Sequence, residues 1–326
     1  MVSVVKWGIL GLGKIAHKFA SDLTLVKDCE LIAVASSSED RAKDFANKFG
    51  VKTFYGAYED LYKDDSVEII YIASLNQNHH SHALNGLQFK KSILCEKPLA
   101  INQRQVKEMI HSAQKHQVFL MEGIWTRFNP AFEQLLQWID QGVIGKLRYI
   151  NATFSFNGLD KDLDSRLFNP EKGGGSLLDI GIYPLFLAYI IMGNPNTIHA
   201  SAVPSKTGVD EQIGMILTYD QSQAILYSSY SHDEDMRATI CGEEGEIYLD
   251  SRWHESPNIK LIKGEKSIDK IFDFLGKGYT YEIKEANKCL RNKDIESSRW
   301  SFQNSLDLVK LMDEVRKQTG IIYPMD

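Results

Sequence analysis

The first third of the chain alternates short apolar runs with stretches in which apolar residues recur every three to four positions. The short runs are typical of strands buried on both faces, and the periodic stretches are typical of helices packed on a sheet. One periodic stretch places Ala42, Phe45 and Ala46 on a single helical face. The predicted strands cover residues 4–10, 30–35, 67–73, 92–96 and 118–122. The helices between these strands are expected to end near residues 25, 49, 89 and 116. The helix that ends near residue 89 is expected to begin near residue 80. Asn102 and Gln105 form a capping box for the helix that ends near residue 116.

After residue 122 the pattern changes to consecutive strands. A helix that begins at Asn129-Pro130 and ends at Gly142 comes first, and another, near residues 178–192, interrupts the strands. Helices near residues 281–290 and 300–318 follow the last strand. The predicted strands cover residues 147–156, 197–203, 212–219, 223–231, 236–241, 246–250 and 259–262. Consecutive strands without crossover helices predict a large, mainly antiparallel open sheet with helices on one face.

A glycine-rich turn follows the first predicted strand, with the sequence Gly11-Leu12-Gly13-Lys14-Ile15-Ala16. The pattern Gly-x-Gly-x-x-Ala between a strand and a helix is the sequence context of a dinucleotide-binding site. Gly11 permits the tight turn, Gly13 lets the backbone approach a pyrophosphate, and Ala16 keeps the helix close to the sheet. The helix N-terminus attracts the phosphate charge. The first third is therefore predicted to be a doubly wound parallel sheet of the Rossmann type.

The end of the second predicted strand bears on which dinucleotide binds. A carboxylate at this place accepts hydrogen bonds from a free ribose diol, whereas this chain has Ser36-Ser37-Ser38, with Arg41 nearby and no carboxylate before Glu39. Hydroxyls and a guanidinium suit a 2′-phosphate, so NADP is favoured over NAD. The alternative is that Ser38 only caps the second helix and that Arg41 is solvated.

Composition agrees with a two-domain globular protein of the α/β class. The chain has 326 residues, of which 43% are hydrophobic, and this is enough apolar material for two cores. We expect a dinucleotide-binding Rossmann domain over residues 1–122. An α+β domain for substrate binding and oligomerisation is expected over residues 123–326, and its C-terminal helix can pack back on the first domain.

Charge and cysteine spacing argue against several classes of partner. The 37 basic and 43 acidic residues give a net charge of −6 without a basic tract, which disfavours nucleic-acid binding. No apolar run is expected to approach the ~20 residues of a membrane span, so we expect a soluble cytoplasmic protein without a membrane partner. The four cysteines lie far apart without paired spacing, which argues against disulfides and against a zinc site.

A lysine follows the predicted strand over residues 92–96, in the motif Glu96-Lys97-Pro98. Ligands bind open α/β sheets at the carboxyl ends of the strands, and Pro98 can fix the turn so that the ammonium points into the crevice. There Lys97 can bind a substrate oxygen and stabilise the negative charge that develops on it. The alternative is a surface lysine at a turn.

The second half supplies a candidate proton carrier. The glycine run over residues 173–175 predicts a flexible or closely approached loop, and a helix that begins near residue 178 places Asp179 and Tyr183 on one face at i and i+4. A hydride leaving a carbinol carbon creates a carbonyl, so the hydroxyl proton must move to a base, for which Tyr183 is our candidate. The ordinary pKa of a phenol lies near ~10, and a neighbouring ammonium such as that of Lys97 can favour the phenolate. The alternatives are a core tyrosine at 183 and an Asp179 that caps the helix or forms a salt bridge.

These motifs, in this order, resemble the glucose-fructose oxidoreductase, inositol dehydrogenase and rhizopine catabolism (Gfo/Idh/MocA) family, and the resemblance covers essentially the whole chain. It rests on Glu96-Lys97-Pro98, Asn76-x-x-His79, Asp179-x-Gly-x-Tyr183 and Gly242-x-x-Gly245. The segment over residues 122–130, together with the tyrosine at 183, is most similar to the branch of dimeric dihydrodiol dehydrogenase and NADP-dependent D-xylose dehydrogenase.

The resemblance implies an NAD(P)-dependent dehydrogenase that acts on CH–OH groups of a sugar, cyclitol or vicinal diol, and a homodimer or higher homo-oligomer packed through the open sheet. It implies Lys97 and Tyr183 as the catalytic pair, with Asp179 orienting the site. The predicted cofactor contacts are Gly11, Gly13, Lys14, Ile15, Ala16, Ser36, Ser37, Arg41, Ser74, Asn76, His79, Glu96 and Lys97. The predicted substrate contacts are Lys97, Trp125, Arg127, Phe154, Asp179 and Tyr183.

Two departures from the family pattern affect the site. Much of the family has His where this chain has Tyr183, so an Asp-His proton relay does not transfer to Asp179. The dihydrodiol dehydrogenase branch tends to place an arginine after the second strand, where this chain has Ser37. The second departure weakens the NADP assignment.

Other interpretations of the same residues stay open. Trp125 and Phe128 also suit packing at a domain interface. The histidines at positions 79, 80 and 82 lack a carboxylate at a ligand-like interval, which argues against a metal site. The fold also allows a non-catalytic NAD(P)-binding sensor, although the presence of both Lys97 and Tyr183 argues for the enzyme.

Overall fold

The computed structural model describes residues 3–326, which form two compact units. Unit 1 comprises the residues up to Phe128 together with Phe274–Leu306, and unit 2 comprises Asn129–Asp273 together with Asp307–Asp326. Residues 274–306 thus group with unit 1. The functional division after residue 122 stays a prediction.

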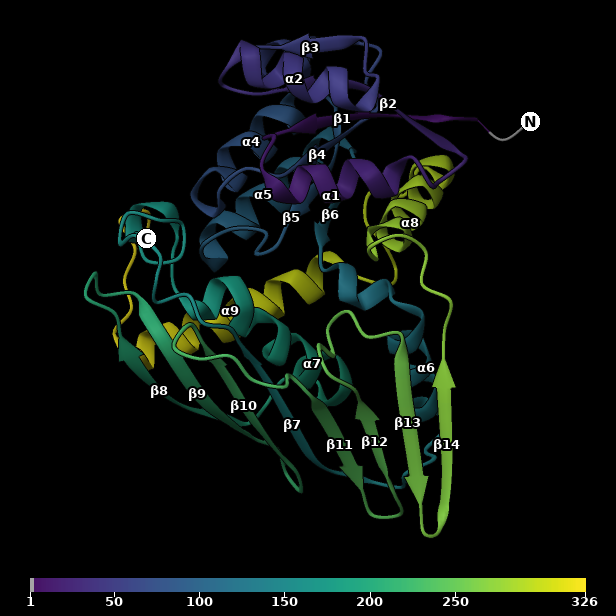
Figure 1. Ribbon diagram of the computed structural model, residues 1–326, viewed down its shortest axis with the longest axis vertical. Coiled ribbons are helices and arrows are strands. Elements are labelled where there is room, and N and C mark those ends of the chain that lie inside the picture. The colour runs from purple at the N-terminus through teal and green to yellow at the C-terminus, as the bar shows by residue number, and fades with distance from the viewer. Residues whose placement is uncertain (1–2) are drawn as a thin grey trace. The chain divides into compact units, whose positions relative to one another are not determined.

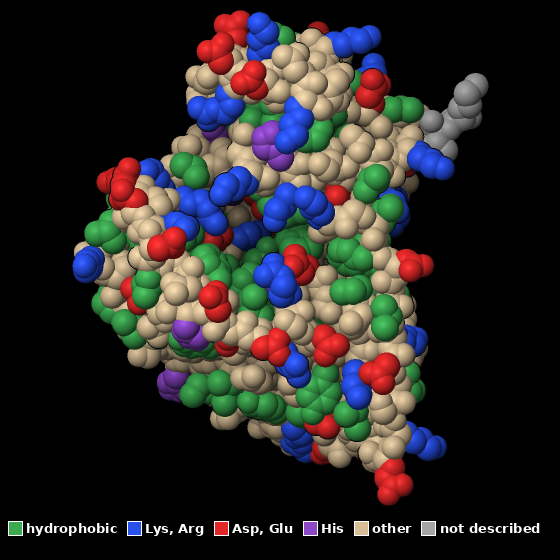
Figure 2. Space-filling model, in the orientation of Figure 1, with side chains coloured by type: hydrophobic (Ala, Val, Ile, Leu, Met, Phe, Trp, Pro, Cys, Tyr) green, Lys and Arg blue, Asp and Glu red, His purple; other side chains and the backbone are tan. Residues whose placement is uncertain are grey.

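Within each unit, acidic and basic side chains are interspersed on the face drawn in Figure 2.

Unit 1 is built on a parallel sheet, as the alternating pattern predicted, and the sheet has six strands where five were predicted (Figure 1). Its strands are β1 (Val5–Leu10), β2 (Cys29–Ala35), β3 (Thr53–Tyr55), β4 (Ile69–Ile72), β5 (Ser92–Glu96) and β6 (Leu120–Gly123). The order β3-β2-β1-β4-β5-β6 reverses direction between β1 and β4. Doubly wound sheets bind ligands at such a reversal, outside the carboxyl ends of the strands. The pattern missed β3, a three-residue strand at the sheet edge.

The helices of unit 1 are α1 (Lys14–Leu23), α2 (Glu39–Phe49), α3 (Tyr58–Lys63), α4 (Asn76–Gln88), α5 (Gln103–His116) and α8 (Tyr279–Asn292). The predicted cap of α5 is confirmed, because Asn102 Oδ1 accepts from the Gln105 N–H at 3.0 Å while Gln105 Oε1 accepts from the Ile101 N–H at 3.2 Å. Helix α4 begins at Asn76 and not near residue 80, because the polar residues of its first turn carry no apolar period.

Helix α8 joins unit 1 from near the far end of the chain, and a buried carboxylate fixes its start. Asp22 of α1 accepts from the N–H groups of Lys277 and Tyr279, each at 2.9 Å, and Tyr279 is the first residue of α8. Burial raises the pKa of Asp22, and these N–H donors oppose the shift. Since a carboxylate also interacts favourably with a helix N-terminus, Asp22 caps a helix that begins 257 residues away in sequence.

Unit 2 contains a mainly antiparallel open sheet, as predicted, and the sheet has eight strands where seven were predicted. Its strands are β7 (Leu147–Ser155), β8 (Thr197–Pro204), β9 (Asp210–Thr218), β10 (Gln223–Ser229), β11 (Ala238–Gly242), β12 (Glu246–Leu249), β13 (Asn258–Lys263) and β14 (Lys266–Ile271). Their order is β14-β13-β12-β11-β7-β10-β9-β8, and within it only the pair of β7 and β10 is parallel. The pattern missed β14, an edge strand whose side chains are all exposed and therefore show no buried alternation.

The helices of unit 2 are α6 (Pro130–Asp140) and α7 (Ile182–Met192), joined towards the end of the chain by most of α9 (Phe302–Thr319). Asn129 caps α6 as predicted, with its Oδ1 accepting from the Ala131 N–H at 2.8 Å. Helices α6 and α7 pack on one face of the sheet (Figure 1). Large apolar side chains on the strands are also exposed, among them Ile216 and Ile225, which pair in register across β9 and β10.

The stretch Pro170–Met192 corrects one expectation. It is helical over most of its length with a mean hydropathy of 1.7, so by length and composition it could cross a membrane. In the structure 78% of its apolar window is buried inside the protein, as in the core helix of a globular unit. The expectation that no apolar run approaches a membrane span was wrong, because α7 is apolar on all sides.

Candidate active site

The glycine turn of unit 1 leaves room for a dinucleotide phosphate. Gly11 has a positive φ of 84°, and a Cβ atom there would lie 2.8 Å from the Ala73 carbonyl oxygen, so no other residue fits without a shift. Gly13 is the N-cap of α1, and a Cβ atom there would meet nothing within 4 Å. The backbone of the turn is therefore tightly held at Gly11 and open at Gly13. This arrangement fits a pyrophosphate at the start of α1.

The serines that follow β2 have different surroundings. Ser36 is buried, and its Oγ accepts from the Ser38 N–H at 3.3 Å. Ser38 caps α2, since its Oγ accepts from the Arg41 N–H at 3.4 Å, and this confirms the capping part of the alternative interpretation. Ser37 and the Arg41 side chain are exposed, together with the acidic Glu39 in the first turn of α2.

The turn that carries Lys97 begins at the end of β5. Glu96, the last residue of the strand, accepts a hydrogen bond from the Tyr71 hydroxyl of β4. The Lys97–Pro98 peptide bond is cis, and the Lys97 side chain is half-buried. The next residue, Leu99, donates its N–H to Glu122 Oε1 at 2.8 Å. The turn is thus held at both ends by buried side chains of neighbouring strands.

Glu122 is a buried acid that sequence reasoning did not assign to the site. Its carboxylate also accepts from Ser305 Oγ at 2.6 Å and from Trp300 Nε1 at 3.2 Å. Burial raises its pKa, while these donors and the positive charge of Lys97 oppose the shift. The only sequence signal was a carboxylate inside an apolar strand that ends at the same sheet edge as Lys97. Glu122 therefore fixes the backbone beyond Lys97.

His79 lies inside unit 1, with no exposed surface. Its Nδ1 is 2.8 Å from the Pro98 carbonyl oxygen and its Nε2 is 3.2 Å from the Ser74 carbonyl oxygen. Burial lowers the pKa of His79, so the ring is neutral and donates to one of these carbonyls at a time. It ties the loop after β4 to the turn of Lys97. A contact of His79 or of Asn76, the first residue of α4, with a cofactor stays a prediction.

The two neighbouring histidines have separate partners. His80 Nε2 lies 2.7 Å from Glu108 Oε2, and His82 Nδ1 lies 2.9 Å from the Tyr62 hydroxyl. Over residues 3–326, no three His, Cys, Asp or Glu side chains are grouped so that they could hold a metal ion.

The segment after β6 places its aromatic and basic side chains inside unit 1. Trp125 is buried and stacks on Tyr279 of α8, with ring centroids 5.2 Å apart at 26°. Arg127 donates its Nε–H to the Arg299 carbonyl oxygen at 2.9 Å. The Arg299 guanidinium packs on the face of the Phe128 ring, with its Cζ atom 4.9 Å from the ring centroid. Trp125 and Phe128 thus pack inside unit 1, so their packing at a domain interface stays an open interpretation, and substrate contacts of Trp125 and Arg127 stay predictions.

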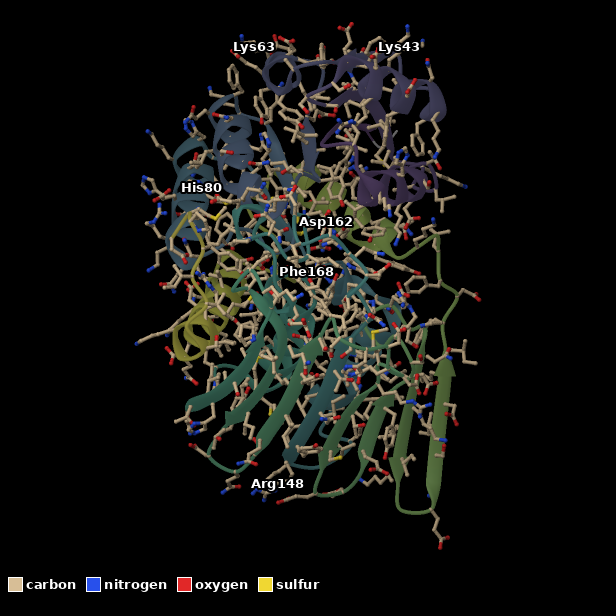
Figure 3. The ribbon with its side chains drawn as sticks, turned by 60° about the vertical axis from the view of Figure 1, so that its left-hand side comes forward. Lys43, Lys63, His80, Arg148, Asp162 and Phe168 are labelled. Carbon is tan, nitrogen blue, oxygen red and sulfur yellow. The ribbon has the colours of Figure 1, made fainter. Side chains whose placement is uncertain are left out.

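In unit 2, Asp179 lies in a π-helical turn, Leu177–Gly181, directly before α7. Its Oδ2 accepts from Arg166 Nη1 at 2.8 Å and from the Tyr230 hydroxyl at 3.1 Å. Arg166 belongs to the loop after β7, on which Asp162 and Phe168 are labelled in Figure 3. The salt bridge that sequence reasoning left open for Asp179 is therefore present. Together with the Tyr230 hydroxyl, it holds Asp179 Oδ2 in place.

A second carboxylate holds the start of this helix. Asp210 of β9 is fully buried, and its Oδ2 accepts from Ser176 Oγ at 2.7 Å and from the Leu177 N–H at 2.6 Å. Its Oδ1 has no hydrogen-bond partner among the described residues. Burial raises the pKa of Asp210 to about 6, and the hydrogen bonds oppose the shift. Gly175 has a φ of 110° and lies so close to Asp210 that the glycine run is a closely approached loop.

Tyr183, in the first turn of α7, packs in a group of aromatic rings that we call the ring cluster: Phe154, Tyr183 and His254. Phe154 lies 5.5 Å from Tyr183 and 4.2 Å from His254, between ring centroids. The ring centroids of Tyr183 and His254 lie 5.4 Å apart. All three side chains are buried. Sequence reasoning found Phe154 and Tyr183 but missed His254, which stands in an irregular segment without a motif.

Each unit thus gathers part of the predicted site. In unit 1, Lys97 shares one sheet edge with Glu96, Glu122 and His79. In unit 2, a single short segment carries Asp179 and Tyr183. That Lys97 and Tyr183 act together stays a prediction.

Two family descriptions match most of the chain. Residues 5–124 match the GFO/IDH/MocA oxidoreductase family with a NAD-binding Rossmann fold, and residues 132–248 match the GFO/IDH/MocA C-terminal domain. Trans-1,2-dihydrobenzene-1,2-diol dehydrogenase of Xenopus tropicalis is 36% identical over 332 residues, covering 98% of this chain and 99% of that protein. The same enzyme of Homo sapiens is 34% identical over 335 residues, covering 99% of both.

Solved structures share the fold over nearly the whole chain. KijD10, a 3-ketoreductase from Actinomadura kijaniata in complex with NADP and TDP-benzene, superposes with a TM-score of 0.87 at 23% identity, covering 97% of this chain and 98% of that one. The aldose-aldose oxidoreductase from Caulobacter crescentus, complexed with glycerol, reaches a TM-score of 0.89 at 20% identity with the same coverage. At these identities the likeness concerns the fold.

Proposed function

The chain belongs to the Gfo/Idh/MocA family of nicotinamide-dependent oxidoreductases, and we propose that it is an NADP-dependent dehydrogenase of a vicinal diol, sugar or cyclitol. The observation that carries the proposal is the 36% identity with a diol dehydrogenase over 98% of the chain, combined with Lys97 at the carboxyl end of β5. Family membership agrees with the resemblance drawn from the motifs. The substrate class and the site residues are our proposal.

The nicotinamide supplies a hydride acceptor when it is bound. Within unit 1, the open backbone at Gly13 and the start of α1 would hold the pyrophosphate, with Lys14, Ile15 and Ala16 as the first helical turn. The Lys97 ammonium would bind the reacting oxygen and stabilise negative charge on it. The hydrogen bond from Leu99 to Glu122 would keep Lys97 in place, because it fixes the backbone two residues further on.

Tyr183 would move the proton. In the oxidation direction the substrate O–H bond breaks and its proton passes to the Tyr183 oxygen, while the carbon loses a hydride and becomes a carbonyl carbon. The Lys97 ammonium would favour the phenolate that accepts this proton. Asp179, fixed by Arg166 and Tyr230, would orient the substrate from the turn before α7.

The preference for NADP rests on the surface at the end of β2. Ser37 and the Arg41 guanidinium are exposed there, and Ser38 is engaged as a helix cap. A guanidinium and a hydroxyl suit a 2′-phosphate, whereas the exposed Glu39 does not. NADP also accompanies KijD10, which shares the fold.

We also propose a cytoplasmic homodimer or higher homo-oligomer formed through the open sheet of unit 2. Val203, Ile216 and Ile225 are large apolar side chains of β8, β9 and β10, each at least 41% exposed. A second copy that covered them would remove this apolar surface from water. Neither a nucleic acid nor a membrane is part of the proposal.

A panel of substrates tests the function. Trans-1,2-dihydrobenzene-1,2-diol, D-xylose and myo-inositol are each incubated with NADP or NAD, and reduced nicotinamide is followed by its absorbance. We expect turnover with NADP on at least one of them and weaker turnover with NAD. Binding of NADPH in a fluorescence titration, without turnover on any aldose, inositol or diol, would instead favour a non-catalytic sensor.

A further inference from the structure

The ring cluster contains one member that neither the motifs nor the proposed reaction uses. His254 stacks on Phe154 at 4.2 Å with an angle of 24° between the ring planes, and it contacts Tyr183 at 5.4 Å with an angle of 48°. Only 3% of its surface is exposed. Its imidazole therefore occupies one side of the phenol that is proposed to carry the proton.

The segment that carries His254 is irregular, yet its backbone is firmly attached. Trp253 is fully buried and donates its Nε1–H to the Thr153 carbonyl oxygen at 2.9 Å, one residue before Phe154. The Trp253 N–H donates to the Met236 carbonyl oxygen at 3.2 Å. On the other side of His254, Asn129 Nδ2 donates to the Ser256 carbonyl oxygen at 3.1 Å. Anchors before and after His254 thus fix where its ring lies.

Tyr183 needs such a support. It is the second residue of α7, and two torsions separate its ring from the backbone, so the helix alone does not fix the phenol oxygen. Phe154 and His254 contact the ring from two separate segments and restrict both torsions. A misplacement of about 1 Å at a reacting group can lower a rate by about a hundredfold.

We propose that His254 is a positioning residue, whose ring holds the Tyr183 phenol against Phe154 in the orientation that proton transfer requires. The inference rests on the proposed role of Tyr183. It assigns to His254 the shape and stacking of an aromatic ring, so phenylalanine can replace it and alanine cannot.

The test compares H254A and H254F with the wild type and with H232A as a matched control. His232 also stacks on a tyrosine, Tyr227 at 5.9 Å, elsewhere in unit 2. We expect H254A to lower kcat tenfold to a hundredfold with an unchanged KM for NADP, and H254F and H232A to stay within threefold of the wild type. A kcat of H254A within twofold of the wild type, or an H254F as slow as H254A, would overturn the proposal.

A double-mutant cycle with Y183F asks whether His254 acts through Tyr183. If it does, adding H254A to Y183F lowers the residual rate less than threefold, because the phenol oxygen is already absent. A full tenfold further loss would show that His254 acts elsewhere and would overturn the inference while leaving the catalytic role of Tyr183 intact.

A direct measurement separates this inference from the proposed function. Tyr183 is replaced by 3-fluorotyrosine and its fluorine NMR signal is recorded. We expect one sharp signal in the wild type and in H254F, and a broadened or divided signal in H254A. Loss of ring order in H254A supports the inference even if no tested substrate turns over, whereas an unchanged signal in H254A contradicts it whatever the substrate.

Discussion

Replacing Asp210 with asparagine isolates a buried charge at the start of the helix that carries Asp179. The carboxylate accepts from Ser176 and Leu177 through Oδ2, and its Oδ1 has no hydrogen-bond partner among the described residues. An asparagine keeps one oxygen for both donors and removes the charge. The variant therefore changes the protonation equilibrium with little change in shape.

The magnitude follows from the shift in pKa. Burial raises the pKa of Asp210 from 3.8 to about 6, so the folded state holds the proton more tightly than the unfolded state. The contribution of Asp210 to stability is thus fully present below the unfolded pKa and is lost as pH rises through the folded pKa. The raised pKa of Asp210 lowers the free energy of unfolding of the wild type by about 3 kcal/mol at pH 8 and by about 1 kcal/mol near pH 4.5. Stability of D210N relative to the wild type should therefore rise by about 2 kcal/mol between these two pH values.

Urea unfolding followed by circular dichroism gives the free energy of unfolding of both proteins across this range. Comparing the difference at two pH values cancels any pH-independent effect of the amide. The matched control is D235N. Asp235 is exposed, and hydrogen bonds from Ser251 and Arg237 lower its pKa. The stability of D235N relative to the wild type should therefore fall slightly as pH rises, opposite to that of D210N. A difference for D210N that is flat with pH, or that falls towards pH 8, would refute the reasoning.

Three further predictions concern the cofactor and the buried acids of unit 1. R41A should raise the KM for NADP about tenfold in initial-rate measurements and leave the KM for NAD within about twofold, because only NADP has the 2′-phosphate. Equal changes in both KM values would contradict the assignment of Arg41 to this phosphate. D22A should lower the free energy of unfolding by about 1–2 kcal/mol, whereas D22N keeps one oxygen that can accept from both N–H groups of the α8 cap and should lose less stability than D22A in urea titrations. Burial and the charges of Glu96 and Asp22 raise the pKa of Glu282 well above its usual range, so its contribution to stability is present at low pH and is lost as pH rises through the folded pKa. The stability of E282Q relative to the wild type should therefore rise with pH in thermal unfolding, and a difference that falls as pH rises would contradict this.

Local patterns predicted much of the fold because their causes are local. The strand over residues 92–96 is a continuous apolar run, and the cap of α5 needs only Asn102 and Gln105. The start of α4 was not predicted, because the first turn of this helix is polar and carries no apolar period. The edge strand β14 was not predicted, because its side chains are all exposed.

The candidate site was predictable only where a motif carries it. Gly11, Gly13 and Lys97 stand in motifs with a fixed spacing from a strand, and the structure places them at strand ends. The partners that hold the site come from distant segments: Tyr230 is 51 residues from Asp179. Such pairings depend on which strands become neighbours in the open sheet. No local pattern reports that order, which is why His254 was missed. Glu122 was visible as a carboxylate in an apolar strand, but its distant partners Trp300 and Ser305 were not.

The central claim is that Lys97 acts on the reacting oxygen, and kcat of K97M tests it most directly. Methionine keeps the length and apolar stem of lysine and removes the ammonium. With the best substrate of the panel and saturating NADP, we expect kcat to fall by about a hundredfold or more, while the Kd for NADPH in a fluorescence titration stays within about threefold. Near-normal turnover in K97M would contradict the account.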